Sequence, residues 1–182
     1  MGRGKGTGRG QFLFFTACCL IDTHFILTTK SNNMPNDPNM VEVLLVEDNM
    51  DDAELTIREL KKHNMANQLY HVKDGEEALD FIFAKRSYLG TRQIQFPPKL
   101  ILLDIQMPKV NGIEVLEAIK SDPRTAKIPV IILTSSNENT DIQKCYKLGA
   151  NSYIVKPVNF INFASAIKNL GYYWLLLNHF PF

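Results

Sequence analysis

From residue 40 onward, the chain alternates short apolar runs with segments in which apolar residues recur at helical spacing. Four runs are almost continuously apolar, at residues 41–46, 99–103, 128–133 and 152–155. Runs of this length suit the central strands of a parallel sheet that is covered by helices on both faces. Residues 68–73 predict one further strand, which is less apolar and therefore expected nearer an edge of the sheet.

Helices are predicted between and after these strands. Asp51-x-x-Glu54 resembles a capping box that would begin the first helix, and Gly149 is placed to end the fourth, which is expected over residues 138–148. The fifth helix is expected to end near Gly171. The apolar stripes expected to face the sheet are Ala53, Ile57 and Leu60; Ala78, Leu79, Ile82 and Phe83; Val115, Leu116 and Ile119; and Phe160, Phe163, Ala164, Ile167 and Leu170.

This alternation predicts an α/β fold with a doubly wound, five-stranded parallel sheet and helices on both faces. Right-handed crossovers are expected, and the flavodoxin-like strand order 2-1-3-4-5 is the natural arrangement. Ligands of such sheets bind beyond the carboxyl ends of the strands, at the point where the winding reverses. In this order the reversal lies between the first and the third strand.

Acidic residues follow both of those strands. Glu47 and Asp48 come directly after the first, and Asp104 comes directly after the third. Like charges this close raise carboxyl pKa values unless a cation compensates, and magnesium usually takes one or two carboxylates plus waters and phosphate oxygens. The alternative is that such acids only cap the helices that follow, a role that Asn49 or Asp51 could fill. Two acidic strand ends on adjacent strands favour the cation site.

Two other strand ends carry residues suited to a phosphoryl group. Thr134 ends the fourth strand, where its hydroxyl could donate to a phosphoryl oxygen and the small Ser135 leaves room. Lys156 follows the fifth strand, and a cis bond to Pro157 would aim its ammonium at Asp104. Such a bond costs about 0.5–1 kcal/mol, against about 1.5–3 kcal/mol for a charge-assisted hydrogen bond. Taken by itself, Thr134 would be an ordinary β-branched strand residue. Taken by itself, Lys156 would be a solvated lysine at a strand end.

The composition fits one globular domain with tails. The 182 residues are 45% hydrophobic and 21% charged, and the formal net charge is +1. Nothing in this balance favours nucleic acid or an anionic membrane as a partner. The three cysteines, of which Cys18 and Cys19 are adjacent, give no disulfide framework or zinc-site spacing and fit a reducing compartment.

The first 39 residues differ in character from the rest. A start rich in Gly and Arg precedes an apolar stretch at residues 12–21, which resembles a signal peptide and is too short to span a bilayer. No small-x-small cleavage site follows it. We therefore expect residues 1–39 to be a disordered or non-native extension, with the natural start at Met34 or Met40. The domain is then expected over residues 40–171, and an apolar tail over residues 172–182.

The spacing of the strand-end residues resembles that of the receiver domain of two-component response regulators. The resemblance is carried by an acidic pair after the first strand, an Asp after the third, a Thr after the fourth and a Lys-Pro pair after the fifth. It implies a phosphoacceptor signalling protein, not an enzyme, with intrinsic autophosphorylation and autodephosphorylation chemistry and a Mg²⁺ cofactor. The implied roles are Asp104 as acceptor of a phosphoryl group from a sensor kinase histidine; Asp48, Asp104 and the backbone carbonyl of Gln106 as metal ligands, with Glu47 acting through a water; Thr134 and Tyr153 as switch pair; and Lys156 as countercharge.

Three segments resemble, more narrowly, the single-domain regulators that partner bacterial phytochrome histidine kinases. These are Thr134-Ser-Ser136, Ser152-Tyr-Ile-Val-Lys-Pro157 and Tyr173-Trp-Leu-Leu-Leu-Asn178. The likeness implies a cytoplasmic homodimer that passes its signal by protein contact or onward phosphotransfer. An apolar tail also predicts an interface in its own right. Gln106 and Ser136, two residues after the acceptor and the switch Thr, are expected to set the phosphoryl lifetime.

Other functions fit the sequence less well. A haloacid-dehalogenase-type phosphatase also uses a strand-end Asp and magnesium, but it needs a second Asp where this chain has Gln106. A receiver-like module that signals without phosphorylation would not need Asp104, Thr134 and Lys156 together. A transcription factor is disfavoured because only eleven residues follow Gly171.

Overall fold

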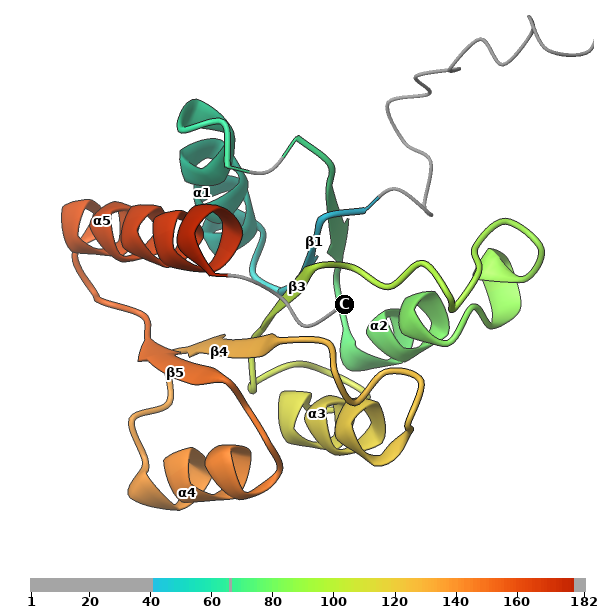
Figure 1. The fold of residues 1–182 in the computed structure, drawn as a ribbon. Coiled ribbons are helices and arrows are strands. Elements are labelled where there is room, and N and C mark those ends of the chain that lie inside the picture. Colours follow the sequence, from blue (N-terminus) through green and yellow to red (C-terminus); the bar gives the residue numbers. More distant parts are fainter. Residues whose placement is uncertain (1–40, 66, 179–182) are drawn as a thin grey trace, which may run out of the picture. The chain divides into compact units, whose positions relative to one another are not determined.

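The computed structural model describes residues 41–65 and 67–178. Five parallel strands form one sheet in the order β2-β1-β3-β4-β5, which confirms the predicted order and fold class (Figure 1). The predicted extension over residues 1–39 lies outside the described residues. The strands are β1 (Val43–Val46), β2 (Leu69–Val72), β3 (Leu100–Leu103), β4 (Val130–Thr134) and β5 (Ser152–Val155).

Helices cover both faces of this sheet (Figure 1). On one face lie α1 (Met50–Lys62) and α5 (Phe160–Gly171), and on the other lie α2 (Gly75–Ile82), α3 (Gly112–Ser121) and α4 (Asn139–Lys147). A short 3₁₀ helix, η2 (Arg86–Tyr88), follows α2, and a π-helical stretch, η3 (Tyr172–Leu177), follows α5.

Each central strand contributes side chains to both layers. Val43 and Leu45 pack with α1 and α5, whereas Leu44 and Val46 pack with α2, α3 and α4. This is the two-residue alternation of a strand that is covered on both faces. β1, β3 and β4 are buried along their whole length, whereas β2 and β5 at the edges are only partly buried. The lower apolarity of residues 68–73 thus predicted the position of β2 correctly.

The predicted helix stripes face the sheet. Their buried members are Ala53, Leu60, Ala78, Ile82, Val115, Leu116, Ile119, Phe163, Ile167 and Leu170. Ile57, Leu79, Phe83 and Ala164 are half-buried, and the side chain of Phe160 lies outside the described atoms. Gly149 follows α4 with a φ of +96°, the left-handed conformation that was expected at the end of that helix.

The capping box predicted at the start of α1 is wrong. Asn49 is the N-cap residue, and its Oδ1 accepts hydrogen bonds from the backbone N–H groups of Asp51 at 3.0 Å and Asp52 at 3.3 Å. Asn is a strong N-cap residue, and it comes earlier in the chain than Asp51. The helix therefore begins almost directly after β1, with only Glu47 and Asp48 between the strand and the cap.

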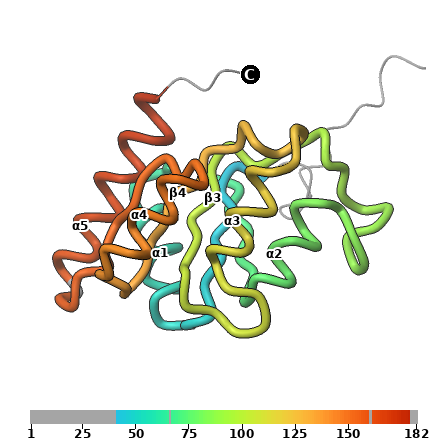
Figure 2. The backbone as a smooth tube through the Cα atoms, turned by 90° about the horizontal axis from the view of Figure 1, so that it is seen from below, coloured from blue at the N-terminus to red at the C-terminus, as the bar shows by residue number. Residues whose placement is uncertain are grey.

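The α-helix α5 ends at Gly171, as predicted, but a π-helical stretch follows it directly. The φ of Gly171, −60°, is helical, and α5 continues into η3, as the red end of the tube in Figure 2 shows. A Cβ at this position would lie 2.6 Å from the Met65 sulfur and 2.8 Å from Leu60 Cδ2. The glycine is therefore needed for the close packing of α5 against α1 and not for chain reversal.

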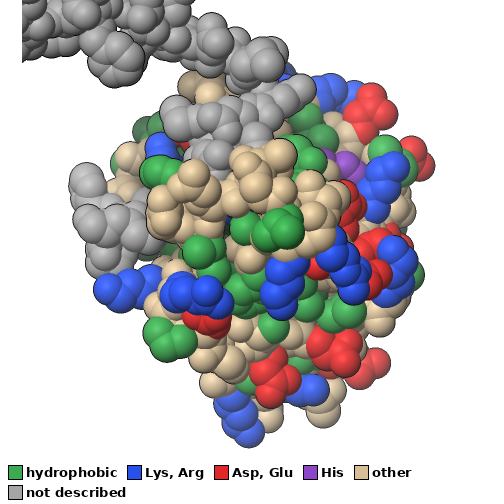
Figure 3. Space-filling view, turned by 90° about the vertical axis from the view of Figure 1, so that its right-hand side faces the viewer, with side chains coloured by type: hydrophobic (Ala, Val, Ile, Leu, Met, Phe, Trp, Pro, Cys, Tyr) green, Lys and Arg blue, Asp and Glu red, His purple; other side chains and the backbone are tan. Residues whose placement is uncertain are grey.

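The surface of the described unit shows charges of both signs. On the α2 side, Lys and Arg side chains alternate with Asp and Glu, with hydrophobic side chains between them (Figure 3). Such mixing agrees with the small net charge of the chain. Within residues 41–65 and 67–178, no helix is both long enough and apolar enough to cross a membrane.

Candidate active site

Strand register brings the acidic strand ends together. Val46 pairs with Leu103 in the parallel ladder of β1 and β3, and the N–H of Asp104 donates to the carbonyl of Val46 at 3.0 Å. Glu47 and Asp104 each lie one residue beyond the C-terminal end of a strand. Both therefore lie at the C-terminal end of the sheet. Both are buried, whereas Asp48 is exposed.

The three acidic residues present oxygen atoms to a common point. One carboxylate oxygen from each of Glu47, Asp48 and Asp104 lies within 4.8 Å of the other two. Hard divalent cations prefer oxygen ligands of this kind, and Mg²⁺ binds through few carboxylates while it keeps several waters. The donor set therefore fits a divalent cation.

Lys156 places its ammonium inside this acidic cluster. Its Nζ donates to Glu47 Oε2 at 2.6 Å, to Asp104 Oδ2 at 2.8 Å and to Asp52 Oδ2 at 3.0 Å. The expected cis bond to Pro157 is wrong, because the described peptide bonds are all trans. The ammonium reaches Asp104 with the trans bond.

Burial and the mutual contacts of Glu47, Asp104 and Lys156 determine the electrostatics of the site. Burial raises the pKa of Glu47 to about 7, and the attraction of Lys156 only partly opposes this. Burial alone would lower the pKa of Lys156, but the charges of Glu47 and Asp104 outweigh it and raise that pKa. Lys156 therefore stays charged, and the remaining negative charge favours the binding of a further cation.

Thr134 ends β4 beside Lys156. Its side chain is fully buried, and its Oγ1 accepts a hydrogen bond from the backbone N–H of Ser136 at 3.3 Å. The hydroxyl of Tyr153 donates to the carbonyl of Ser136 at 3.0 Å. One residue of the loop between β4 and α4 thus links the two predicted switch residues.

The side chain of Ser136 contacts helix α4. Its Oγ donates to Asp141 Oδ2 at 2.7 Å and accepts from the backbone N–H of Glu138 at 3.4 Å. These contacts connect Ser136 to the start of α4, and its predicted effect on the phosphoryl lifetime stays a prediction. Gln106 is exposed, and its backbone N–H donates to Asp104 Oδ1 at 3.2 Å. The proposed roles of its carbonyl oxygen and side chain stay predictions.

Asp52 is the site residue that the sequence patterns missed. It belongs to the first turn of α1, and its carboxylate reaches Lys156 from outside the group formed by Glu47, Asp48 and Asp104. A usable signal was present in the spacing, because Asn49 directly after the acidic pair predicts a helix cap. The third helical residue after that cap is Asp52.

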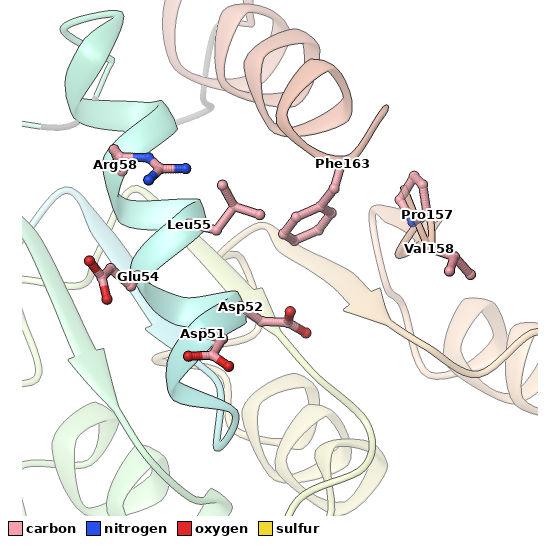
Figure 4. A pocket seen from close by; sticks show the side chains of 8 residues that line it. All are labelled: Asp51, Asp52, Glu54, Leu55, Arg58, Pro157, Val158 and Phe163. Carbon is pink, nitrogen blue, oxygen red and sulfur yellow. The ribbon is translucent and has the colours of Figure 1, made fainter. Parts of the chain in front are cut away.

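A groove adjoins the site between α1 and the loop from β5 to α5. It has a volume of about 370 Å³, and Asp51, Asp52 and Arg58 line it from α1, with Pro157 and Val158 across from them (Figure 4). Asp52 therefore faces both the groove and the ammonium of Lys156.

Comparison with known proteins gives matches over most of the chain. Residues 43–168 match the family described as the response regulator receiver domain. The response regulator Rcp1 of Synechocystis sp. is 34% identical over 140 residues, which are 77% of this chain and 91% of Rcp1. The crystal structure of Mn²⁺-bound Rcp1 has a TM-score of 0.72 at 33% identity and covers 77% of this chain and 98% of its own.

Two other solved structures resemble the chain over similar lengths. The phosphorylated cyanobacterial phytochrome response regulator RcpA has a TM-score of 0.71 at 35% identity, covering 78% of this chain and 99% of RcpA. The bacteriophytochrome response regulator AtBRR has a TM-score of 0.60 at 44% identity, covering 76% of this chain and 98% of AtBRR.

Proposed function

The chain belongs to the response regulator receiver domain family, and on this premise we propose that Asp104 accepts a phosphoryl group from a sensor kinase histidine in a Mg²⁺-dependent reaction. One observation carries the proposal. The carboxylate of Asp104 lies 2.8 Å from the ammonium of Lys156 and in the same oxygen cluster as Glu47 and Asp48. The nucleophile, the countercharge and the cation ligands thus meet at the C-terminal end of the sheet.

The transfer requires positioning and charge neutralisation more than covalent help from the protein. One carboxylate oxygen of Asp104 forms a bond to phosphorus while the phosphorus–nitrogen bond of the phosphohistidine breaks. The imidazole nitrogen keeps the electron pair of that bond. Lys156 neutralises charge on a phosphoryl oxygen, because its ammonium already contacts the acceptor.

The cation would be held by Asp48, Asp104 and the carbonyl of Gln106, with Glu47 acting through a water. A bound Mg²⁺ supplies charge neutralisation for the phosphoryl oxygens. Rcp1 has been crystallised with Mn²⁺, which supports a divalent cation at the corresponding place in this chain.

Thr134 and Tyr153 would report the modification. The Thr134 hydroxyl accepts from the N–H of Ser136 and has its own proton to donate to a phosphoryl oxygen. Motion of Thr134 toward that group would shift Ser136, and with it the acceptor of the Tyr153 hydroxyl and the partner of Asp141. A local change of charge would thus reach α4.

The chain is a signalling protein whose family works with sensor kinases. We propose a phytochrome-type kinase as the partner, since RcpA and AtBRR are phytochrome response regulators by name. Autophosphorylation from small donors, autodephosphorylation and a cytoplasmic location are part of this proposal. So are the boundaries at residues 1–39, 40–171 and 172–182, and a homodimer formed through the last of these segments.

Incubation with acetyl phosphate and Mg²⁺ tests the phosphoacceptor. The wild type is expected to gain one phosphoryl group by intact mass, and Asp104→Asn is expected to gain none. Chelation of Mg²⁺ should abolish the reaction of the wild type. Equal modification of wild type and Asp104→Asn would refute the assignment of Asp104.

A further inference from the structure

The ammonium of Lys156 has three carboxylate neighbours. Two of them, Glu47 and Asp104, were predicted site residues, and the third is Asp52. Glu47 and Asp104 lie 2.6 and 2.8 Å from its Nζ, and Asp52 lies 3.0 Å away. A lysine ammonium has three N–H groups to donate. The three carboxylates therefore occupy all of its donors, and Asp52 takes one of them.

The backbone fixes Asp52 in this position. Its N–H donates to Oδ1 of Asn49, the cap that follows Glu47 and Asp48 directly. The acidic pair, the cap and Asp52 therefore lie within one short segment that is anchored in β1. About a third of the Asp52 side chain is exposed (32%), whereas those of Glu47 and Lys156 are buried (1% and 6%). Asp52 thus holds the ammonium from the outer side of the site.

Of the three carboxylates on the ammonium, Asp52 is the one that neither accepts the phosphoryl group nor belongs to the oxygen group that fits the cation. Asp104 loses its negative charge when it is phosphorylated, and Glu47 belongs to the oxygen group that fits the cation. Asp52 lies outside that group. It can therefore keep one N–H of Lys156 in place while another turns to the phosphoryl oxygen.

We propose that Asp52 is a positioning residue for phosphoryl transfer, which holds the Lys156 ammonium while Asp104 reacts. This inference rests on the proposed function of Asp104 and Lys156. Removal of the carboxylate leaves Lys156 with fewer fixed contacts at the moment when Asp104 releases it, so the ammonium is less well placed for the transition state. For a partly exposed ion pair we expect a loss of about three- to tenfold in the maximal rate.

The chain offers a matched control one residue away. Asp51 carries the same charge in the same helical turn and is exposed, and among the described residues the ion pairs of Lys156 are with Glu47, Asp52 and Asp104. Asp51→Ala therefore removes the same charge and leaves the contacts of Lys156 intact. Asp52→Asn keeps an oxygen acceptor of similar shape and should restore part of the rate.

The test measures the rate of phosphorylation against acetyl phosphate concentration for wild type, Asp52→Ala, Asp52→Asn and Asp51→Ala. Mn²⁺ affinity by isothermal titration and thermal unfolding are measured on the same variants. Expected are a lower maximal rate for Asp52→Ala, an intermediate rate for Asp52→Asn, a rate close to wild type for Asp51→Ala, and Mn²⁺ affinities within about twofold of one another.

Two results would overturn the inference. If Asp52→Ala and Asp51→Ala reacted at equal rates, any change in rate would come from general surface charge. If Asp52→Ala lost Mn²⁺ affinity along with its rate, Asp52 would be a cation ligand. Both results leave Asp104 as acceptor, provided that acetyl phosphate modifies the wild type and not Asp104→Asn. A wild type that acetyl phosphate does not modify would refute the proposed function itself, and this inference with it.

Discussion

The backbone N–H of Lys156 donates to the carbonyl oxygen of Thr134 at 2.7 Å. This bond joins the ends of the neighbouring strands β4 and β5. The residue with the proposed countercharge and the residue with the proposed switch hydroxyl therefore lie side by side. A group bound between them can be contacted by both side chains. We therefore expect phosphoryl binding and the response of the β4–α4 loop to be coupled through this bond.

The first prediction concerns that switch. Thr134→Ala should still accept a phosphoryl group at Asp104, because neither the nucleophile nor Lys156 is changed. It should not pass the change to Tyr153, since the hydroxyl that accepts from Ser136 is gone. Loss of this hydrogen bond should cost about 1 kcal/mol of stability. Chemical-shift changes at Tyr153 and along α4 on addition of beryllofluoride measure the propagation.

Thr134→Ser is the control for this experiment, since it keeps the hydroxyl and removes only a methyl group. It should propagate the change as the wild type does. Shifts that spread to Tyr153 equally far in Thr134→Ala would rule out the hydroxyl as the link.

The second prediction is that residues 1–39 are dispensable for folding and for phosphotransfer. The composition of this segment shares no periodicity with the sheet, and its apolar run would be a liability if it were exposed. A chain that begins at Met40 should match the full chain in melting temperature and in its rate with acetyl phosphate. A melting temperature lower by several degrees would show that the segment packs on the domain.

The third prediction uses the same shortened chain, in which Cys145 is the only cysteine. Cys145 is fully buried, and burial raises the pKa of its thiol from 9.0 to about 11. At pH 8 the native thiolate fraction should be about 100-fold smaller than in the unfolded chain, and the reagent has no access to it. Alkylation by iodoacetamide should therefore be much slower in buffer than in urea.

The same shift fixes the sign of the pH dependence. Because the folded pKa of Cys145 exceeds the unfolded value, the neutral thiol contributes stability that is present below about pH 9. This contribution is lost as the pH rises from 9 toward 11. Cys145→Ser should show a smaller loss of stability over that interval by urea unfolding. If Cys145 in the native shortened chain were alkylated as fast as in the unfolded chain, its buried position would be contradicted.

The acidic strand ends and Lys156 were predictable from the sequence, whereas the role of Asp52 was indicated only by the spacing after Asn49 and the packing role of Gly171 was not indicated at all. Parallel strands end at the same edge of a sheet, so strand prediction alone brings Glu47 and Asp104 together. The position of Asp52 depends on which residue caps α1, and two polar candidates, Asn49 and Asp51, compete for that role within three positions. The role of Gly171 depends on Met65 and Leu60, which belong to a distant segment. Local patterns do not contain such tertiary contacts.

The last prediction concerns the end of the described chain, where one helical stretch has two kinds of apolar residue. Trp174 and Leu175 are half-buried against the layer formed by α1 and α5. Tyr172, Tyr173, Leu176 and Leu177 are each more than half exposed. The segment therefore packs in part on the domain, and it leaves a cluster of large apolar side chains exposed. Such a cluster commonly marks an interface, and a C2 homodimer is its commonest closed form.

Point substitutions test this interface more sharply than deletion, because deletion of residues 172–182 would also remove Trp174 and Leu175, which pack against the core. Leu176→Glu combined with Leu177→Glu should convert a dimer into a monomer by light scattering, with the melting temperature nearly unchanged. The matched control is Leu89→Glu, another exposed leucine, which lies beyond η2. A double variant that stays dimeric would move the interface to the face formed by α4, β5 and α5. A wild type that is monomeric at high concentration, phosphorylated or not, would reject the homodimer.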